Sequence, residues 1–339
     1  MPGVRLRDVA ERAGVSIRTV SNVVNGYVPV SDEKRVRVEA AVAELGYRPN
    51  VIARHLRQGR SGLLALVVPE LDVPYFAELA RVVVTEARAH GYTVVVDQTD
   101  GEPDRERELI MRGGGAELFD GVILSPLALS GADIAGRDSD VPLVLLGERV
   151  GTTEQDHVVI DNVAAAREAT EHLLSLGRRR IAAIGDQPYE TGETAQLRTR
   201  GYREALAAAG VAADESLVVA TPRFHFSDGA GAMGRLLDGP GERPDAVFCF
   251  NDLVAIGALR TLLSRGVRVP DEVAVVGFDD IEAASYTTPT LTTVAPDKAE
   301  IGRMAVDRLL ARLHGETMPN AWAPHRLAVR ESTAGVAHA

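Results

Sequence analysis

The chain has 339 residues, enough for about two ordinary domains and a substantial core, and it is 45% hydrophobic and 25% charged, as a globular protein in water is. Its single cysteine, Cys249, excludes a disulfide within the chain and a cysteine-rich metal site. No apolar run approaches the roughly 20 residues that span a bilayer, and the N-terminus is charged where a signal peptide turns apolar, so we expect a cytoplasmic protein with no membrane partner.

The net charge of −11 is distributed unevenly along the chain. Residues 1–60 hold eleven Lys and Arg against six Asp and Glu, a net +5, and the remaining residues carry a net −16. One interpretation of the basic segment is a solvated charged face. The other is a domain that approaches phosphate, attached to a body that phosphate repels.

The basic segment predicts three short helices. Apolar residues at helical spacing place the first over 5–13, and Gly14 ends it. Ser16 is a good N-cap for a second helix, which the turn dipeptide Asn25-Gly26 ends. A third helix follows over 31–45. Two short helices joined through a glycine and braced by a third indicate a helix-turn-helix unit, with a simple three-helix bundle as the alternative.

The exposed side of the second helix favours DNA as the partner. Arg18 has the two donors that fit guanine, Asn22 fits adenine, and Ile17 packs on a thymine methyl. Short polar side chains around them suit phosphate oxygens. The predicted DNA-binding residues of this segment are Ser16, Ile17, Arg18, Thr19, Ser21, Asn22 and Asn25.

The same residues carry a family resemblance. Residues 6–16 (LRDVAERAGVS), 19–21 (TVS) and 24–25 (VN), then 38–41 (VEAA) and 44–50 (ELGYRPN), resemble the start of a lactose-repressor/galactose-repressor family regulator. The resemblance implies a helix-turn-helix domain over residues 1–48. It also implies that Ile17, Arg18 and Asn22 occupy positions that vary with the operator sequence.

Residues 49–61 form the next distinctive segment, which contains the string NVIARHLRQ. A plain linker turn is one interpretation, because a helix this short is marginal in water. The resemblance instead implies a hinge helix that folds on operator DNA and pairs with its copy from a second subunit. Asn50 would cap it and Ala53 would allow close approach. Arg54 would meet phosphate, and Leu56 would wedge between base pairs in the minor groove.

Beyond residue 62 the chain alternates Val-rich runs with amphipathic stretches. This alternation predicts parallel, doubly wound sheets, and the length favours two similar lobes over one sheet. The expected strands are 63–69, 93–98, 121–125, 143–146, 157–160, 180–184, 246–250 and 273–278. The expected helices are 75–90, 163–176, 196–209, 253–264 and 298–313.

The resemblance continues through this body, in strings such as 198–202 (RTRGY), 250–252 (FND), 277–280 (GFDD) and 329–333 (VREST). It implies the two-lobed α/β fold of periplasmic sugar-binding proteins over residues 62–339, with three crossings between the lobes. Lobe 1 would comprise about 62–162 plus 293–324, and lobe 2 about 163–292 plus 325–339. A small ligand would bind in the cleft, near the carboxyl ends of the strands.

Position by position, the resemblance also implies the residues of the cleft. Tyr75 and Phe76 would form an apolar wall, and Arg198 would be the main polar anchor. Phe226 would stack on the ligand, and Asn251 and Asp279 would bond to its hydroxyl groups. The alternatives are that the aromatic pair belongs to the core, that Asp279 caps a loop, and that Arg198 pairs with Glu193 or Asp186. Glu148 and Pro296 depart from the residues common in sugar-binding relatives, which leaves the ligand open.

These observations together predict a homodimeric repressor without catalytic residues, cofactor or metal. It would bind pseudo-palindromic operator DNA and be released by a small effector, a sugar or sugar phosphate, although nucleobases also occur in the family. A corepressor-dependent repressor or an activator are the alternatives within the family. A plain sugar-binding protein would have no use for residues 1–60. An enzyme is disfavoured because the eight histidines show no metal spacing and no Gly-x-Ser-x-Gly elbow occurs.

Overall fold

The computed structural model describes residues 4–25, 29–47, 60–111, 118–148, 156–189 and 192–335. The chain divides into two compact units, Met1–Ser61 and Gly62–Ala339, and each is described by itself. The predicted hinge residues Asn50, Ala53, Arg54 and Leu56 lie outside the described residues.

The first unit is the predicted helix-turn-helix, built from α1 (Leu6–Ala13), α2 (Ile17–Asn25) and α3 (Asp32–Leu45). Gly14 ends α1 in the left-handed conformation, with φ of 63°. The Thr19 amide donates to Ser16 Oγ at 3.1 Å, so Ser16 caps α2 as expected. The three helices enclose a small core of Val9, Ala10, Ala13, Val20, Val38 and Ala41.

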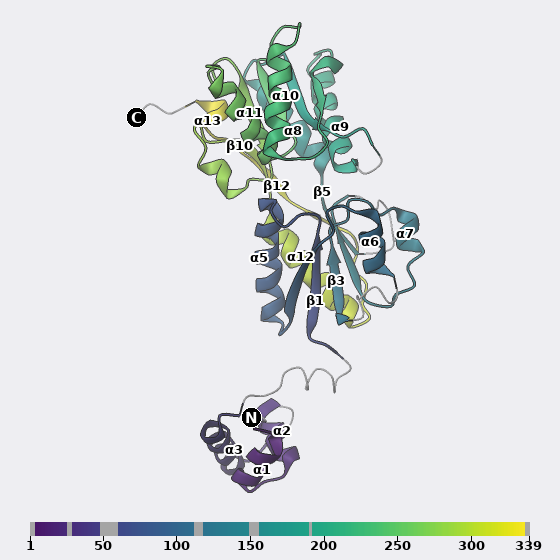
Figure 1. Cartoon of the computed structure of the whole chain (residues 1–339), viewed down its shortest axis with the longest axis vertical. Helices are drawn as coiled ribbons and strands as arrows, with labels where there is room; N and C mark the ends of the chain where they lie inside the picture. The colour runs from purple at the N-terminus through teal and green to yellow at the C-terminus, as the bar shows by residue number, and fades with distance from the viewer. Residues whose placement is uncertain are drawn as a thin grey trace. The chain divides into compact units, whose positions relative to one another are not determined.

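The second unit contains two six-stranded sheets, one in each lobe (Figure 1). The first sheet is all parallel, in the order β11-β5-β4-β3-β1-β2. Its strands are β1 (Leu63–Val68), β2 (Thr93–Gln98), β3 (Gly121–Leu124), β4 (Leu143–Leu146), β5 (Asp156–Ile160) and β11 (Ala321–Ala323). The second sheet has the order β12-β10-β9-β8-β6-β7 and is parallel except for β12 against β10. Its strands are β6 (Ile181–Asp186), β7 (Val218–Ala220), β8 (Ala246–Cys249), β9 (Ala274–Phe278), β10 (Thr292–Pro296) and β12 (His325–Ala328).

Helices cover both faces of each sheet, which is why central strands such as β1, β3, β4 and β8 are nearly continuous apolar runs rather than alternating. In the first lobe, α5 (Pro74–Ala89) and α12 (Lys298–Leu313) pack on one face, and α6 (Pro103–Ile110) and α7 (Gly131–Ala135) pack on the other (Figure 1). In the second lobe, α8 (Asn162–Ser175) and α9 (Glu193–Ala208) lie opposite α10 (Phe226–Asp238) and α11 (Asp252–Ser264). Short α13 (Glu331–Ala334) contacts β9 and β10.

The chain crosses between the lobes three times, from β5 to α8, from β10 to α12 and from β11 to β12. One expected boundary needs correction: the residues from 293 to 296 belong to the second lobe. Thr292–Pro296 forms β10, which continues the parallel ladder of β9 with Thr293 opposite Gly277. The first lobe therefore resumes at α12, after β10 has ended.

Candidate functional site

The outer face of α2 carries the predicted DNA-reading side chains. Ile17 is 49% exposed although it is apolar, and Ser16 and Arg18 are exposed beside it. Thr19, Ser21 and Asn22 are half-buried, whereas Val20 faces the core. Asn25 is the last residue of α2, and its side chain is not among those described. The described members of the predicted set thus lie on or beside one accessible surface, as a recognition helix requires.

Some of the basic residues in this unit stabilise it instead of facing a partner. Arg37 donates through Nε to the Ala13 carbonyl at 3.0 Å and so joins α3 to the end of α1. Arg12 forms an ion pair with Glu44 at 2.6 Å. The net positive charge of the segment therefore overstates the number of side chains available to phosphate.

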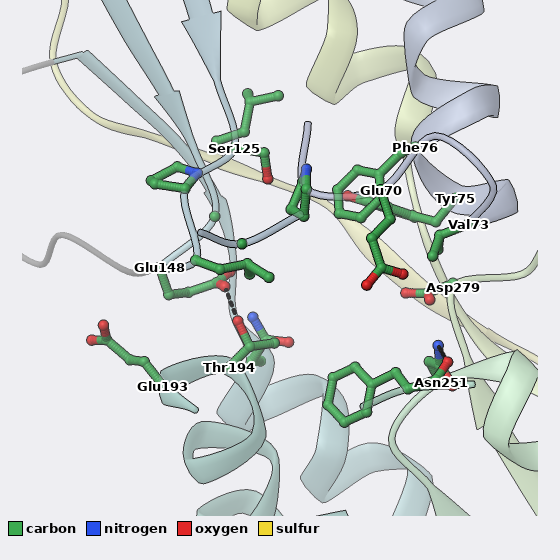
Figure 2. A pocket seen from close by; sticks show the side chains of 18 of the residues that line it. Glu70, Val73, Tyr75, Phe76, Ser125, Glu148, Glu193, Thr194, Asn251 and Asp279 are labelled. Carbon is green, nitrogen blue, oxygen red and sulfur yellow. Dashed lines mark hydrogen bonds between the residues drawn. The ribbon is translucent and has the colours of Figure 1, made fainter. Parts of the chain in front are cut away.

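In the second unit, the strand order places a cavity at the carboxyl ends of both sheets. In the first sheet β2 lies on one side of β1 and β3 on the other, and in the second sheet β7 and β8 flank β6 in the same way. Where the strand order reverses in this manner, a crevice opens at the carboxyl ends of the strands, here at β1 and β3 and at β6 and β8. A cavity of about 340 Å³ occupies this region, lined by residues of both lobes. Figure 2 shows side chains from the two lobes converging on it.

Arg198 on α9 is the buried cation of the described cavity lining, only 6% exposed. Its Nε donates to Asn162 Oδ1 at 2.8 Å, Nη1 donates to the Phe250 carbonyl, and the guanidinium lies 3.5 Å over the centre of the Phe278 ring. Burial lowers the pKa of Arg198, and the carboxylates of Asp279 and Glu148 oppose that shift. Asp186, one of the alternative partners, instead accepts a hydrogen bond from Thr199 at 2.6 Å.

Asp279 follows β9 and is 9% exposed. Its φ of 109° is unusual for a residue other than glycine and is held by the surroundings. The Asp279 amide donates to the Val294 carbonyl at 2.8 Å, and Lys298 Nζ donates to the Asp279 carbonyl at 2.7 Å. Burial raises the pKa of its carboxyl to about 6, although Arg198 and Lys298 favour the ionised form.

The predicted aromatic wall lies on the first lobe. Tyr75 and Phe76, at the start of α5, both line the cavity and pack edge to face with their ring centres 5.3 Å apart. Burial, and after it the Asp279 carboxylate, raise the pKa of the Tyr75 hydroxyl, which therefore remains a hydrogen-bond donor at neutral pH.

Asn251 and Phe226 differ in their relation to the cavity. Asn251 lines it, but its Oδ1 accepts from the Val254 amide at 2.8 Å and caps α11, while its Nδ2 donates to the Phe224 carbonyl at 3.0 Å. Phe226 is 50% exposed and is not among the lining residues, a correction to the expected stacking position. The reason is that Phe226 is the first residue of α10, so the helix sets the direction of its side chain. Phe224, in the preceding loop, lines the cavity instead.

Two contacts across the cavity were not anticipated from the sequence. Thr194 on α9 donates to Glu148 Oε2 at 3.1 Å, joining the second lobe to the first, and Figure 2 shows this bond as a dashed line. His225 Nε2 of the second lobe lies 2.9 Å from Glu70 Oε2 of the first, so this pair also joins the two lobes. Burial raises the pKa of Glu148, and Arg198 opposes that shift. Glu148 was noticed only as a departure from relatives, and nothing in the local pattern marked Glu70 or His225.

Two kinds of feature are absent from the part of the chain that the structure describes. No group of three or more His, Cys, Asp or Glu side chains there is arranged to hold a metal ion. No described helix combines the length and the apolar character that crossing a membrane requires.

A helix-turn-helix unit joined to two doubly wound lobes with a cavity between them defines a class of protein: DNA-binding regulators with a body like that of the periplasmic binding proteins. The comparisons agree with this class. Residues 5–50 match the model of bacterial regulatory proteins, lacI family, and residues 170–333 match that of the periplasmic binding protein-like domain.

Individual relatives cover nearly the whole chain. The ribose operon repressor of Escherichia coli (strain K12) is 34% identical over 318 residues, 92% of this chain and 94% of its own. The lac repressor dimer bound to operator and the anti-inducer ONPF matches with a TM-score of 0.82 and 30% identity, over 98% of this chain and 99% of its own. The transcriptional regulator CelR in complex with cellobiose has a TM-score of 0.70 and 35% identity, over 97% and 99%. The chain belongs to the lacI family of bacterial transcriptional regulators.

Proposed function

We propose that this regulator represses genes of carbohydrate uptake or catabolism, binding a pseudo-palindromic operator as a homodimer and leaving it when a sugar-like effector enters the cavity between its lobes. The observation that carries the proposal is the combination, in one chain, of an exposed recognition face on α2 with a cavity that contains Arg198 and Asp279. The names of the ribose operon repressor and of the CelR–cellobiose complex support a carbohydrate effector. The operator-bound lac repressor dimer supports the homodimer.

On the DNA side, one α2 helix reads each half-site in the cytoplasm, where the operator lies. Arg18 and Asn22 make the base contacts, Ile17 contacts a thymine methyl, and Ser16 and Thr19 position the helix on phosphates. Asn50, Ala53, Arg54 and Leu56 form the hinge helix, with Leu56 opening a base step at the centre of the operator.

On the effector side, ligand binding changes how the two lobes are held together. Tyr75 and Phe76 form the apolar wall, while Arg198, Asn251 and Asp279 provide the polar groups. A ligand shifts operator affinity only by its differential affinity for the two lobe arrangements. The opposite preference would make the same protein corepressor-dependent, and an activator differs only in where it contacts the transcription machinery.

Fluorescence anisotropy with pooled palindromic DNA tests this function, at one fixed salt concentration and with a panel of uncharged sugars. We expect selective binding that one sugar weakens. Arg18→Ala should relax sequence selectivity, whereas Arg35→Ala, which removes an equal charge from an exposed position on α3, should weaken binding to all sequences alike. Binding that is unselective, or that no sugar alters, would contradict the proposal.

A further inference from the structure

The charge of the cavity carries information about its ligand. Two arginines, Arg198 and Arg223, line it, and Arg223 is exposed at the rim. Five acidic residues line it as well: Glu70, Asp100, Glu148, Glu193 and Asp279. Even when His225 is counted as positive, the described lining has more negative than positive charge, and its acids include the buried Asp279.

The buried arginine is already held by the protein through two of its five N–H donors and one face of the guanidinium. Its Nε is bonded to Asn162, its Nη1 to the Phe250 carbonyl, and one face of the guanidinium is covered by Phe278. Arginine binds carboxylates and phosphates most strongly through two parallel N–H donors. The fork formed by Nε and Nη2 is not available here, because Nε is occupied. The remaining N–H groups, one on Nη1 and two on Nη2, can donate to hydroxyl or ring oxygens of a ligand.

The remaining polar atoms suit a ligand that is rich in hydroxyl groups. Among the described residues, the Asp279 carboxylate accepts no hydrogen bond, so it is free to accept from ligand hydroxyls. Asn162 is 2% exposed, and its Nδ2 is buried without a partner. A buried amide N–H without an acceptor is unfavourable, so a ligand oxygen within its reach would be favoured.

Resting on the proposed effector role of this cavity, we propose that the effector is a polyhydroxylated compound without negative charge, and that the cavity rejects phosphorylated and carboxylated sugars. Carboxylates accept hydrogen bonds from sugar hydroxyls but repel phosphate and carboxylate groups, and the repulsion is strong where water is excluded. The raised pKa values of Glu148 and Asp279 agree with this, because one buried guanidinium does not offset the burial of both acids.

Isothermal titration calorimetry of the full-length protein with matched pairs of ligands tests the proposal. The pairs are ribose with ribose 5-phosphate, glucose with glucose 6-phosphate, and glucose with glucuronate. In any pair with a binder, we expect the uncharged member to bind at least about tenfold more tightly, which corresponds to one pKa unit of charge interaction. An anionic member that binds equally well or better would overturn the proposal.

Two substitutions separate charge from shape. Glu148→Gln should weaken the uncharged sugar and reduce the tenfold gap, since it removes a negative charge and retains the side-chain length. Glu316→Gln makes the same chemical change in an exposed turn and should leave the gap unaltered. If the two variants behave alike, the acidic cavity does not cause the discrimination and the proposal is wrong.

Inorganic phosphate provides a probe that does not depend on knowing the effector. The wild-type protein should not bind phosphate at Arg198, so Arg198→Lys should leave its phosphate titration unchanged. A Glu148→Gln/Asp279→Asn protein, its fold verified by circular dichroism, should bind phosphate measurably. Phosphate bound by the wild type through Arg198 would overturn the charge proposal. If the wild type rejects phosphate and no sugar binds at all, the charge proposal stands and the sugar-controlled function fails.

Discussion

Glu106 offers a sensitive test of how the first lobe shapes the cavity. This carboxylate on α6 is fully buried. Its Oε2 accepts from the Ala128 and Leu129 amides at 2.8 and 3.0 Å, and its Oε1 accepts from the Leu127 amide at 2.8 Å and from Thr99 Oγ1 at 3.3 Å. The loops after β2 and β3 both line the cavity, and Glu106 holds them together without touching a ligand itself.

Glu106→Ala would leave three backbone N–H groups without their acceptor. Each buried unsatisfied donor costs about 1–3 kcal/mol, so we expect the free energy of unfolding to fall by about 3–9 kcal/mol, the lower end applying if water enters the space. Glu106→Gln keeps one oxygen that accepts from two of the amides, and its loss should be about 1–3 kcal/mol. Glu108→Ala, on the exposed side of the same helix, should lie within about 0.5 kcal/mol of the wild type.

Urea unfolding followed by circular dichroism measures this series, and sugar titration of the folded variants measures the effect on the cavity. We expect the free energy of unfolding to be lowest for Glu106→Ala, higher for Glu106→Gln, and highest for Glu108→Ala and the wild type. Sugar binding should be weakest in the Glu106→Ala protein. A Glu106→Ala protein as stable as the Glu108→Ala control would refute the reasoning, since the three amides would then have found other acceptors at no cost.

Three further predictions address the site and the hinge. Arg198→Lys removes the bond to Asn162 or Phe250, so the effector response should be lost while operator affinity measured by anisotropy stays within about twofold. The pKa of Asp279 is about 6 in the folded protein and about 3.9 in an unfolded chain, so the folded state retains the proton longer and stability falls as pH rises between those values. Asp279→Asn should therefore raise the free energy of unfolding at about pH 7 by up to about 3 kcal/mol and make it less dependent on pH. Urea midpoints that change with pH in the variant as they do in the wild type would disprove this. Leu56→Ala should weaken specific operator binding by roughly tenfold or more with sugar binding unchanged, and equal operator affinity in the two proteins would remove the wedge from the account.

The strands and helices that the sequence predicted are those with a large apolar surface. Two of the eight expected strands match the observed bounds and the other six differ by one or two residues at an end, because parallel strands covered on both faces are nearly continuous apolar runs. Strands β7, β11 and β12 were not expected, since they are three or four residues long and lie at sheet edges with polar or half-exposed positions. Strand β10 was missed for another reason: Thr292 and Thr293 open it, and their burial depends on Asp252 and α13, which are remote in sequence.

A residue of the cavity could be predicted from the sequence only where its position follows from the strand or helix to which it belongs. Asp279 directly follows a strand and Arg198 lies on a helix that the periodicity predicts, so both reach the carboxyl ends of the sheet. Phe226 failed because the start of α10 decides where it points, and that helix, which contains three glycines, was not among the expected helices. Glu148 with Thr194 and Glu70 with His225 join segments far apart in the sequence, and no local pattern encodes such pairs.

The contacts between the lobes explain why the cavity is suited to control. Lys298, at the start of α12 in the first lobe, donates to the carbonyls of Asp279 and Asp280 in the second and pairs with Glu78 at 2.6 Å. Three more contacts cross the cleft: Thr194 to Glu148 at 3.1 Å, His225 to Glu70 at 2.9 Å, and the Glu282 amide to Glu78 at 3.0 Å. Two of these involve carboxylates that line the cavity, so an effector hydroxyl that bonds to Glu148 or Glu70 competes with the partner from the other lobe.

This competition has the magnitude that regulation needs. A hydrogen bond contributes about 0.5–1.5 kcal/mol net, and one to a charged group about 1.5–3 kcal/mol, so exchanging one or two inter-lobe bonds for ligand bonds changes the balance between lobe arrangements by about 1–3 kcal/mol. That range equals the coupling free energies of about 1–3 kcal/mol that change affinity at a second site by roughly 5- to 150-fold. Deeper cores within each lobe need not rearrange, because the exchange is confined to side chains at the cleft. A ligand that bound only to groups without a partner in the other lobe would gain affinity without shifting that balance, which is why the pairing of Glu148 with Thr194 and of Glu70 with His225 matters more for control than the tightness of any single contact.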